Sequence, residues 1–508
     1  MNKIDIFNSS IVINNYNFGD CKQLENYFKI YDRVNHNYYY LGLYYDDKNK
    51  KLYLPRGIDI WLVEKLIGTD AHVHINSHYK YQRFDNIYIK FLPRDDVQKE
   101  ALRFMLGKKE YRKTAGDSQL SVNLLTGKGK TYVTIAALAY MGIRGIVITN
   151  SIGWLEQWKN KAIEYTNITD KEIYNISGSI QVQKTLRSSD EYLMRYKLFL
   201  VTHDTLQSYA SNHGWESIGK LFEHLKIGVK IYDEAHLNFM NMCMIDFFTN
   251  VYKTFYLTAT PAKSSDDENR VYQLCFRNIP SIELFDGDVD PHTKYIAIMY
   301  NSRPNPIQIS SCKNAYGLDR NGYTNYVVKQ DNFNKLLVIL MDIGLRATMQ
   351  AGQKFLIYIM TNEAIKIVYQ SIIEKFPELR NDIGIYTSIV SKEEKQIALT
   401  KRVILSTTKS AGAAVDIPGL RMTIILAEPF KSEVIAIQTL GRTREDNTMC
   451  IDVIDTGFNQ CLNYYYKKLP AFKKYATDCS VIRLNDKELD DRCNMILNNK
   501  CEPLMVKI

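Results

Sequence analysis

Short apolar segments alternate with helix-like stretches along most of this chain, and this alternation constrains its fold more than any other feature. In a first series, the expected strands are residues 122–125, 145–149, 198–202, 228–232 and 254–258. In a second series, they are residues 354–360, 383–387, 402–406, 423–427 and 450–455. Strands that alternate with helices form parallel sheets. The sequence therefore predicts an α/β protein with two tandem parallel-sheet domains.

Residues 1–88 follow a different pattern and are predicted to form a small α+β domain. Two strand-like segments, 38–45 and 52–55, flank a polar turn, and a helix over 57–67 precedes a strand over 71–75. The region has 11 basic and 10 acidic residues, so it lacks a strongly basic surface. We expect most of its tyrosines to be core residues, with base stacking as the alternative. Because the region is nearly neutral, we expect any part that it plays in nucleic-acid binding to depend on its shape, through docking at a junction, rather than on its charge.

The predicted boundaries are an N-terminal domain at 1–88, parallel-sheet domains at 89–290 and 291–460, and a helical extension at 461–508. A segment rich in Asn, Ser, Pro and Gly, 300–325, is expected to be a surface insertion. No apolar run is long enough to span a membrane. Nine scattered cysteines without a C-x-x-C pair indicate reduced thiols in the cytoplasm, with neither disulfides nor structural zinc. The net charge of +9 permits a nucleic-acid partner without demanding one.

Residues 122–131 (VNLLTGKGKT) combine an apolar strand, a glycine-containing loop and the start of a helix. This order places backbone N–H groups and a helix N-terminus around a phosphate. Lys130 is expected to reach the β- and γ-phosphates of a nucleotide, and the Thr131 hydroxyl to bind Mg²⁺. The other expected phosphate-binding residues are Thr126, Gly127, Lys128 and Gly129. Because Leu124 replaces the first glycine of the G-x-x-x-x-G-K-[ST] pattern, a plain surface turn is the alternative.

About 100 residues further on, an apolar strand ends in two adjacent carboxylates, Asp233 and Glu234. An Asp at the end of a strand can hold Mg²⁺, and the next carboxylate can orient or deprotonate the water that attacks the γ-phosphate. Alone, such a pair is usually a solvated turn. Combined with Lys130 and Thr131, it predicts an enzyme that hydrolyses ATP with Mg²⁺.

Asp233-Glu-Ala-His236 is a DEAH box, and residues 90–455 resemble superfamily 2 helicases and translocases. The resemblance implies two RecA-like domains that close on ATP. It implies that Arg94 and Gln98 read the adenine, and that His236 couples hydrolysis to movement through the Leu257-Thr258-Ala259-Thr260-Pro261 motif. The residues it assigns to coupling in that motif are Thr258 and Thr260. Thr149 and Thr202 are expected to contact nucleic acid.

Two segments of the second domain extend the resemblance. Residues 406–419 (STTKSAGAAVDIPG) resemble motif V, which implies that Thr408 contacts nucleic acid and Asp416 the nucleotide; Ala414 stands where a glycine is usual. Residues 438–444 (QTLGRTR) resemble motif VI, which implies a catalytic role for Gln438. The motif usually reads Q-x-x-G-R-x-x-R, but here its last position is Glu445. Both Arg442 and Arg444 are therefore candidates for the arginine that reaches the γ-phosphate.

Within the superfamily, the chain looks most like phage UvsW-type helicases and the related Rad25/XPB group. The features that carry this are the WLEQW sequence at 154–158, which resembles the family's L-x-x-Q-W, and the L-P-x-G-I segment at 54–58. The resemblance implies a DNA helicase that remodels branched DNA in replication, recombination or repair. An RNA helicase or viral transcript-release ATPase is the first alternative. A nucleotide-regulated nucleic-acid-binding protein that hydrolyses nothing is the second.

Two further segments allow more than one interpretation. Residues 464–475 (YYYKKLPAFKKY) interleave aromatics with lysines, which suits either a surface that follows a nucleic-acid strand or a helix with a solvated basic face. His72, His74 and His78 are interpreted as part of a polar strand face, because no Cys or carboxylate stands at ligand spacing beside them.

Overall fold

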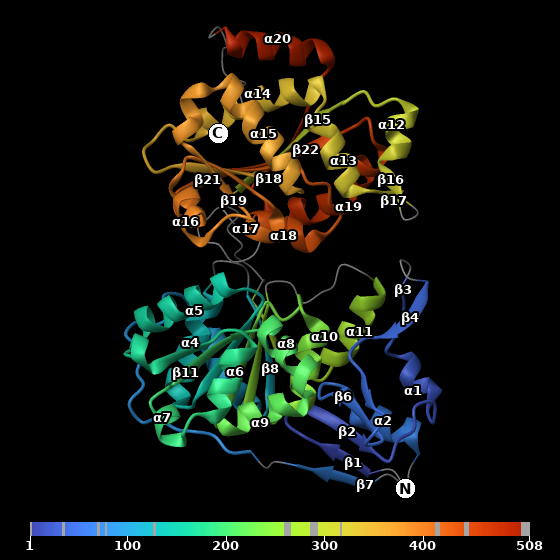
Figure 1. Ribbon diagram of the computed structural model, residues 1–508, viewed down its shortest axis with the longest axis vertical. Coiled ribbons are helices and arrows are strands. Elements are labelled where there is room, and N and C mark those ends of the chain that lie inside the picture. The colour runs from blue at the N-terminus through green and yellow to red at the C-terminus, as the bar shows by residue number, and fades with distance from the viewer. Residues whose placement is uncertain are drawn as a thin grey trace. The chain divides into compact units, whose positions relative to one another are not determined.

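The computed structural model describes residues 3–32, 36–68, 72–76, 79–124, 129–258, 266–284, 293–314, 317–411, 417–440 and 447–498. The chain forms two compact units, Met1–Asp286 and Gly287–Ile508 (Figure 1). The first unit contains an N-terminal sheet and a larger parallel sheet, and the second unit contains another parallel sheet. No helix among the described residues is long and apolar enough to cross a membrane.

The N-terminal sheet has the strand order β5-β6-β2-β1-β7. Its strands are β1 (Lys3–Ile6), β2 (Ser10–Asn14), β5 (Tyr44–Asp46), β6 (Lys51–Pro55) and β7 (His72–Ile75). Two helices accompany it, α1 (Lys22–Asn26) and α2 (Ile60–Ile67). The strand expected over 38–45 is interrupted at Gly42, whose φ of +72° suits glycine. Its first half is β4 (Asn37–Tyr40), which pairs with β3 (Lys29–Asp32) as a separate two-stranded ribbon.

The first parallel sheet has the order β10-β11-β9-β12-β13-β8-β14. The strands are β8 (Gln119–Asn123), β9 (Gly145–Thr149), β10 (Ile173–Ile176), β11 (Leu198–Thr202), β12 (Val229–Asp233), β13 (Lys253–Thr258) and β14 (Ser281–Glu283). Alternate residues of β9 enter two different cores, Ile146 and Ile148 on one face and Val147 on the other. Helices therefore cover both faces of the sheet.

The helices of the first unit that follow α2 precede, connect or flank these strands. They are α3 (Asp96–Leu106), α4 (Lys130–Met141), α5 (Ile152–Tyr165), α6 (Gly178–Arg187), α7 (Asp190–Met194), α8 (His203–His213), α9 (Glu216–His224), α10 (Phe239–Phe248) and α11 (Asp266–Phe276). Short 3₁₀ turns lie at Lys109–Ala115 and Asp170–Glu172.

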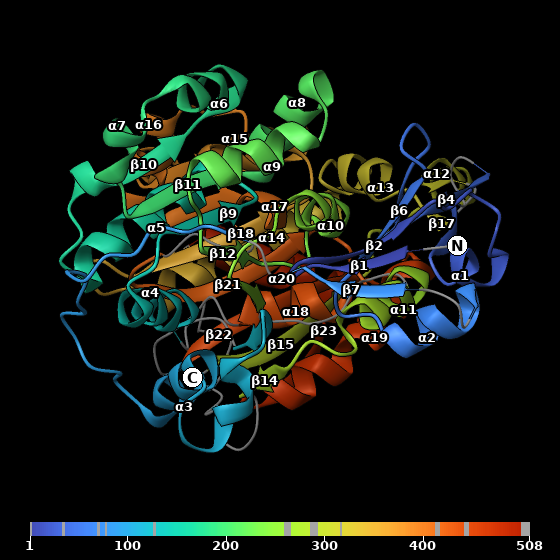
Figure 2. The ribbon, with the colours of Figure 1, turned by 90° about the horizontal axis from the view of Figure 1, so that it is seen from below.

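The N-terminal sheet packs against α10 and α11 (Figure 2), and residues of the sheet and of both helices belong to one hydrophobic core. Leu54 of β6 and Phe239 of α10 are both buried in it. At Gly57 the chain passes so close to α11 that a Cβ atom would lie 2.2 Å from the carbonyl oxygen of Cys275. The N-terminal sheet is therefore a part of the first unit, and its removal would expose a large apolar surface.

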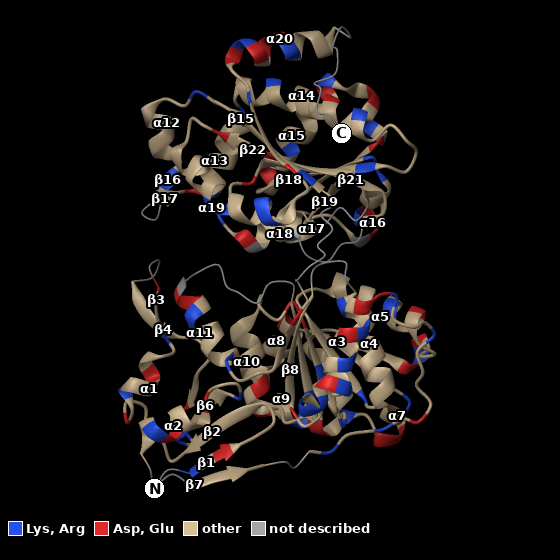
Figure 3. Ribbon diagram, turned by 180° about the vertical axis from the view of Figure 1, so that it is seen from behind, with Lys and Arg blue, Asp and Glu red and all other residues tan. Residues whose placement is uncertain are grey.

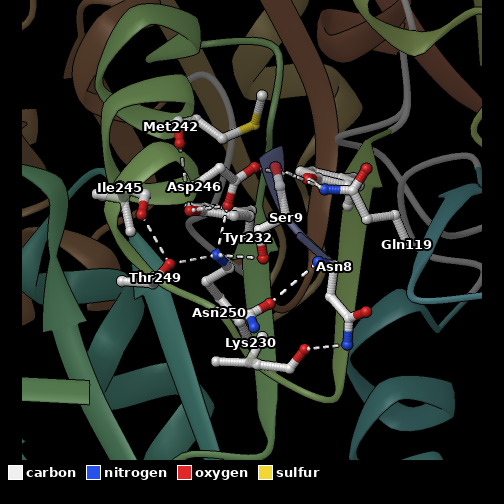
Figure 4. Close-up of polar contacts among 12 residues, drawn as sticks. Asn8, Ser9, Gln119, Lys230, Tyr232, Met242, Ile245, Asp246, Thr249 and Asn250 are labelled. Carbon is white, nitrogen blue, oxygen red and sulfur yellow. Dashed lines mark hydrogen bonds and ion pairs between the residues drawn. The ribbon is translucent and has the colours of Figure 1, made fainter. Parts of the chain in front are cut away.

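A buried polar cluster adds a second connection at the base of the parallel sheet (Figure 4). Lys230 of β12 and Asp246 of α10 form an ion pair, 2.5 Å between Nζ and Oδ1. The Lys230 ammonium also lies 3.5 Å from the Ser9 hydroxyl in the turn between β1 and β2. The neighbouring Asn8 donates its side-chain amide to the carbonyl oxygen of Val251 at 2.9 Å.

The second unit contains a parallel sheet of order β19-β20-β18-β21-β22-β15-β23. Its strands are β15 (Thr293–Tyr300), β18 (Lys354–Ile359), β19 (Ile383–Tyr386), β20 (Val403–Ser406), β21 (Leu420–Ala427), β22 (Thr448–Asp455) and β23 (Cys479–Arg483). The edge strand β23 comes from the segment assigned above to a helical extension, and it pairs with β15.

Helices again lie on both sides of this sheet. They are α12 (Pro306–Ser311), α13 (Arg320–Val327), α14 (Asp331–Ala347), α15 (Asn362–Lys375), α16 (Lys392–Thr400), α17 (Thr408–Ala411), α18 (Glu433–Leu440), α19 (Asn459–Tyr475) and α20 (Asp486–Leu497). The 300–325 segment contains α12, a small hairpin of β16 (Lys313–Asn314) and β17 (Gly317–Leu318), and part of α13. Tyr323 of α13 is buried in the core, so this segment is only in part a surface insertion. The predicted class, two parallel-sheet domains after a small α+β region, is confirmed.

Candidate nucleotide-binding site

Lys130 is the first residue of α4, directly after Gly129, whose φ of +91° turns the chain into the helix. This places Lys130 beyond the carboxyl end of β8, where the ends of parallel strands gather at one edge of the sheet. The preceding predicted phosphate-binding residues Thr126, Gly127 and Lys128 lie outside the described residues. Thr131, the predicted Mg²⁺ ligand, is the second residue of the helix and is half-buried.

The Lys130 ammonium forms an ion pair with Glu234, 2.7 Å from Nζ to Oε1. Both side chains are largely buried, with 11% and 8% of their surface exposed. Glu234 follows the last residue of β12 and has a φ of +50°, which is uncommon for a residue other than glycine. A residue held in this conformation at the end of a strand often serves function rather than stability.

Asp233 ends β12 next to this pair and accepts a hydrogen bond from the Trp158 indole, 2.8 Å from Nε1 to Oδ2. Burial, together with the neighbouring Glu234 carboxylate, raises the pKa of Asp233 to about 6 against the opposing effect of Lys130. Trp158 ends the WLEQW segment, whose sequence alone predicts no role for this indole. The indole fixes the orientation of one carboxylate oxygen.

His236 connects the two predicted coupling motifs. Its Nδ1 lies 2.8 Å from the hydroxyl oxygen of Thr258, at the end of β13, and 3.5 Å from Oε2 of Glu234. His236 and Thr258 are buried. The second predicted threonine of that motif, Thr260, lies outside the described residues. His236 therefore links the Glu234 carboxylate to the adjacent strand.

Gln98 lies on α3 beside the start of α4. The Asp95 side chain caps α3 by accepting a hydrogen bond from the backbone N–H of Gln98 at 2.8 Å. The backbone N–H of Arg94 donates to the side-chain oxygen Oε1 of Gln98 at 3.1 Å. A Cβ atom at Gly129 would lie only 2.3 Å from Gln98 Nε2. The structure thus brings the predicted adenine-reading residues next to the predicted phosphate loop.

The hydroxyls of the three predicted nucleic-acid contacts are engaged within the fold. Thr149 is buried and donates to the carbonyl oxygen of Ser151 at 3.0 Å. Thr202 caps α8 by accepting from the Thr205 amide at 3.2 Å. In the second unit, Thr408 donates its hydroxyl to Glu428. Contact of these threonines with nucleic acid stays a prediction.

Four further residues of the second unit were predicted to act on the nucleotide. Gln438 lies in α18, but nothing is described of its side chain. Asp416, Arg442 and Arg444 lie outside the described residues.

The aromatic and basic segment 464–475 forms the greater part of α19. It buries Lys468, whose ammonium lies 2.7 Å from Asp452 Oδ2, and it buries Phe472 in the core. This placement favours the structural interpretation of that segment over a strand-following surface.

The chemistry of the described residues fits a nucleoside triphosphate with Mg²⁺. The Lys130 ammonium can neutralise phosphate charge, and the absence of a side chain at Gly129 lets the backbone come close to a ligand. Asp233 and Thr131 supply the oxygen ligands that Mg²⁺ prefers. Because burial and the Glu234 carboxylate raise the pKa of Asp233, a cation bound beside it would favour its charged form.

Comparison with known proteins agrees with this site. A family model described as type III restriction enzyme, res subunit, matches residues 91–263. Over 150 residues, the chain is 27% identical to Rad25 of Haloarcula marismortui, named as a DNA 3'-5' helicase; this covers 29% of the chain and 21% of that protein. Over 171 residues, it is 28% identical to DNA 3'-5' helicase XPB of Mycobacterium tuberculosis, with coverage of 33% and 29%. The chain thus matches less than a third of the length of these curated relatives.

Among solved structures, Dbp5 of S. cerevisiae, bound to RNA and ADP BeF3, superimposes with a TM-score of 0.51 at 15% identity. The superposition covers 80% of this chain and 93% of that chain. At this identity it shows the fold alone, which is a pair of RecA-like domains. The parallel-sheet fold, the site residues and the partial matches to proteins named as DNA helicases agree with one another.

Proposed function

We propose that the chain is an ATP-dependent, Mg²⁺-requiring DNA helicase or translocase. The observation that carries the proposal is the Lys130–Glu234 ion pair beside Asp233 at one edge of the first parallel sheet. These are the groups that phosphoryl transfer to water needs: a cation for the phosphates, a carboxylate for the metal and a carboxylate for the water. The bound Mg²⁺ would neutralise charge on the phosphates.

Each described residue has a definite task in this proposal. Lys130 leaves Glu234 to contact phosphate, which frees the Glu234 carboxylate to accept a proton from the attacking water. Asp233, oriented by Trp158, presents its oxygens to the metal. His236, placed between Glu234 and Thr258, transmits a change at the nucleotide to the end of β13.

The proposed finer identity is a DEAH-box enzyme of the phage UvsW-type and Rad25/XPB group that remodels branched DNA in replication, recombination or repair. The DEAH sequence at 233–236 and the similarity to proteins named as DNA helicases support it. We further propose that Asp416, Gln438 and one of Arg442 and Arg444 act on the nucleotide. The proposed location is the cytoplasm, because the described cysteines are all free thiols.

The test is ATP hydrolysis at one salt concentration with no nucleic acid, single-stranded DNA, duplex DNA, forked DNA or RNA. We expect DNA to stimulate hydrolysis, forked DNA to do so most, and the Lys130→Ala variant to stay inactive with all of them. Stronger stimulation by RNA than by any DNA would favour an RNA helicase or transcript-release ATPase. Nucleotide binding without hydrolysis under every condition would favour a nucleotide-regulated binding protein.

A further inference from the structure

An aromatic row lies on the outer side of the N-terminal sheet and the β3–β4 ribbon, and the proposed mechanism uses none of it. Its members are partly or fully exposed and form two groups by ring contact, Tyr31 with Tyr38 and Phe18 with Tyr40 and Tyr45. Tyr38, Tyr31 and Phe18 are 60%, 41% and 40% exposed. Aromatic rings this exposed and this close together mark an interaction surface.

The register of the ribbon explains why these rings face outward. Tyr31 of β3 lies directly opposite Tyr38 of β4, with ring centroids 5.0 Å apart. The adjacent pair, Ile30 and Tyr39, faces the other way, because side chains alternate along a strand. Ile30 is buried, and the Tyr39 hydroxyl lies 3.4 Å from Glu268 of α11. One face of the ribbon therefore packs on the protein, and the other presents tyrosine rings.

The ribbon is fixed to the part of the first unit that follows the nucleotide site. Arg270 of α11 donates hydrogen bonds to the carbonyl oxygens of Tyr27 and Lys29, at 2.7 and 3.2 Å. Helix α11 is the next helix after β13, the strand that ends at Thr258 beside His236. Figure 1 shows β3 and β4 beside α11. The ribbon is thus held by the first helix that follows the strand ending at Thr258.

The charge around the row favours unpaired bases as its ligand. The Lys29 ammonium lies 4.2 Å from the centroid of the Tyr38 ring. The Lys50 ammonium lies 6.0 Å from that of Tyr45 and forms an ion pair with Asp47 at 2.8 Å. Elsewhere among the described residues of the N-terminal sheet, basic and acidic residues are mixed (Figure 3). Rings with a few lysines hold single-stranded nucleic acid by stacking, whereas duplex binding depends on many phosphate contacts.

We propose that the outer face of the β3–β4 ribbon, centred on Tyr31 and Tyr38, stacks on unpaired bases of the strand on which the ATPase acts. The proposal rests on the proposed function for the identity of the ligand. It assigns to the N-terminal region a grip on single strands. Because stacking carries this grip, it depends less on salt than phosphate contacts do.

The test measures how tightly the full chain, without ATP, binds a single-stranded oligonucleotide that contains 2-aminopurine. The fluorescence of 2-aminopurine reports the binding, and the measurement is made at two salt concentrations. The Tyr31→Ala/Tyr38→Ala double variant should bind about tenfold more weakly or worse, because one stacked base is worth roughly 1–3 kcal/mol. Tyr38→Phe keeps the ring and should bind like the wild type. Tyr88→Ala removes a tyrosine that is 63% exposed but lies outside the ribbon, and it should have no effect.

The proposal is overturned if the double variant binds as tightly as the wild type, if Tyr88→Ala weakens binding equally, or if the wild type does not bind single strands. The proposal is also overturned if the double variant loses binding to another protein while it still binds the oligonucleotide as the wild type does. ATP hydrolysis by the wild type is measured separately, so that the two proposals can fail independently. DNA-stimulated hydrolysis with unchanged binding by the double variant rejects only the stacking role. Absence of hydrolysis with ring-dependent binding rejects only the ATPase.

Discussion

Lys130 and Glu234 are 104 positions apart in the sequence, yet the Lys130 ammonium lies 2.7 Å from the Glu234 carboxylate. Each group neutralises the other in a largely buried site, where an uncompensated charge is costly. In the proposed mechanism, phosphate replaces Glu234 as the partner of Lys130. Nucleotide binding then releases the catalytic carboxylate, so that the base becomes available only when substrate is present.

Replacement of Lys130 by alanine should abolish ATP hydrolysis. The variant loses the cation that contacts phosphate, and it leaves Glu234 beside Asp233 without the opposing charge. The pKa of Asp233, already about 6, should rise further. Steady-state hydrolysis with saturating DNA is the measurement, and circular dichroism checks that the fold is intact. Hydrolysis near the wild-type rate would show that Lys130 does not bind phosphate.

Glu234→Gln should separate binding from turnover. The amide keeps the size of the side chain but cannot accept the proton of water, so kcat should fall by roughly 10²- to 10⁴-fold. Nucleotide binding should be retained, because Asp233 and Lys130 are unchanged. Binding of a fluorescent ATP analogue, measured beside hydrolysis, distinguishes the two effects. If hydrolysis stays fast, another group must activate the water.

The displaced motif VI predicts that one of two arginines is catalytic. Alanine at the correct position, Arg442 or Arg444, should lower kcat by about 10³-fold or more while changing nucleotide affinity much less. The other variant serves as the matched control. Single-turnover hydrolysis by both variants decides between them, and an unchanged rate in both would remove the arginine from the proposal.

Sequence pattern predicted the parallel sheets well because each strand there is a compact apolar run between helices. The predicted strands 145–149 and 198–202 coincide with β9 and β11. It failed to predict β1 and β2, whose apolar runs are short and are bounded by Asn, Asp and Ser. It also joined β4 to β5, because the break depends on the φ of a single residue, Gly42.

For the site, too, the sequence predicted what local motifs carry and missed the contacts between distant residues. Local motifs indicated Lys130, Asp233 and Glu234, and the structure brings the three together at one edge of the sheet. The hydrogen bond from Trp158 to Asp233 joins residues 75 positions apart, which no local pattern reports. The burial of the Lys468 side chain was equally invisible, since its partner Asp452 lies on another element.

Buried His203 predicts a loss of stability in acid. Burial lowers the pKa of His203 to about 4 in the folded protein, whereas an unfolded histidine titrates near 6.5. The neutral ring is therefore favoured in the fold, and its contribution to stability is present above pH 6.5 and lost as the pH falls from there toward 4. We expect the thermal midpoint of His203→Phe, which can still stack on Tyr232, to fall less over this range than that of the wild type. The exposed His213 provides the control: His213→Phe should follow the wild-type profile.

The ion pair between Lys230 and Asp246 predicts an asymmetric loss of stability. Besides Lys230, Asp246 accepts hydrogen bonds from the hydroxyls of Tyr232 and Tyr256, at 2.8 and 2.6 Å. Asp246→Ala leaves a fully buried ammonium with only neutral hydroxyl partners, which should cost about 3–5 kcal/mol. Lys230→Met leaves the carboxylate with its two tyrosine donors, so the loss should be smaller, roughly 1–3 kcal/mol. Denaturant unfolding measures both.

Two further measurements tie this cluster to the attachment of the N-terminal sheet. The Lys230→Met/Asp246→Leu double variant should lose less stability than the sum of the single variants, because it removes both charges together. Asp190→Ala breaks the exposed Lys226–Asp190 pair and should barely change unfolding. Since the Lys230 ammonium lies next to Ser9, hydrogen exchange in the turn between β1 and β2 should increase in Asp246→Ala. A larger loss in Lys230→Met than in Asp246→Ala, or unchanged exchange at that turn, would mean that the cluster does not hold the N-terminal sheet in place.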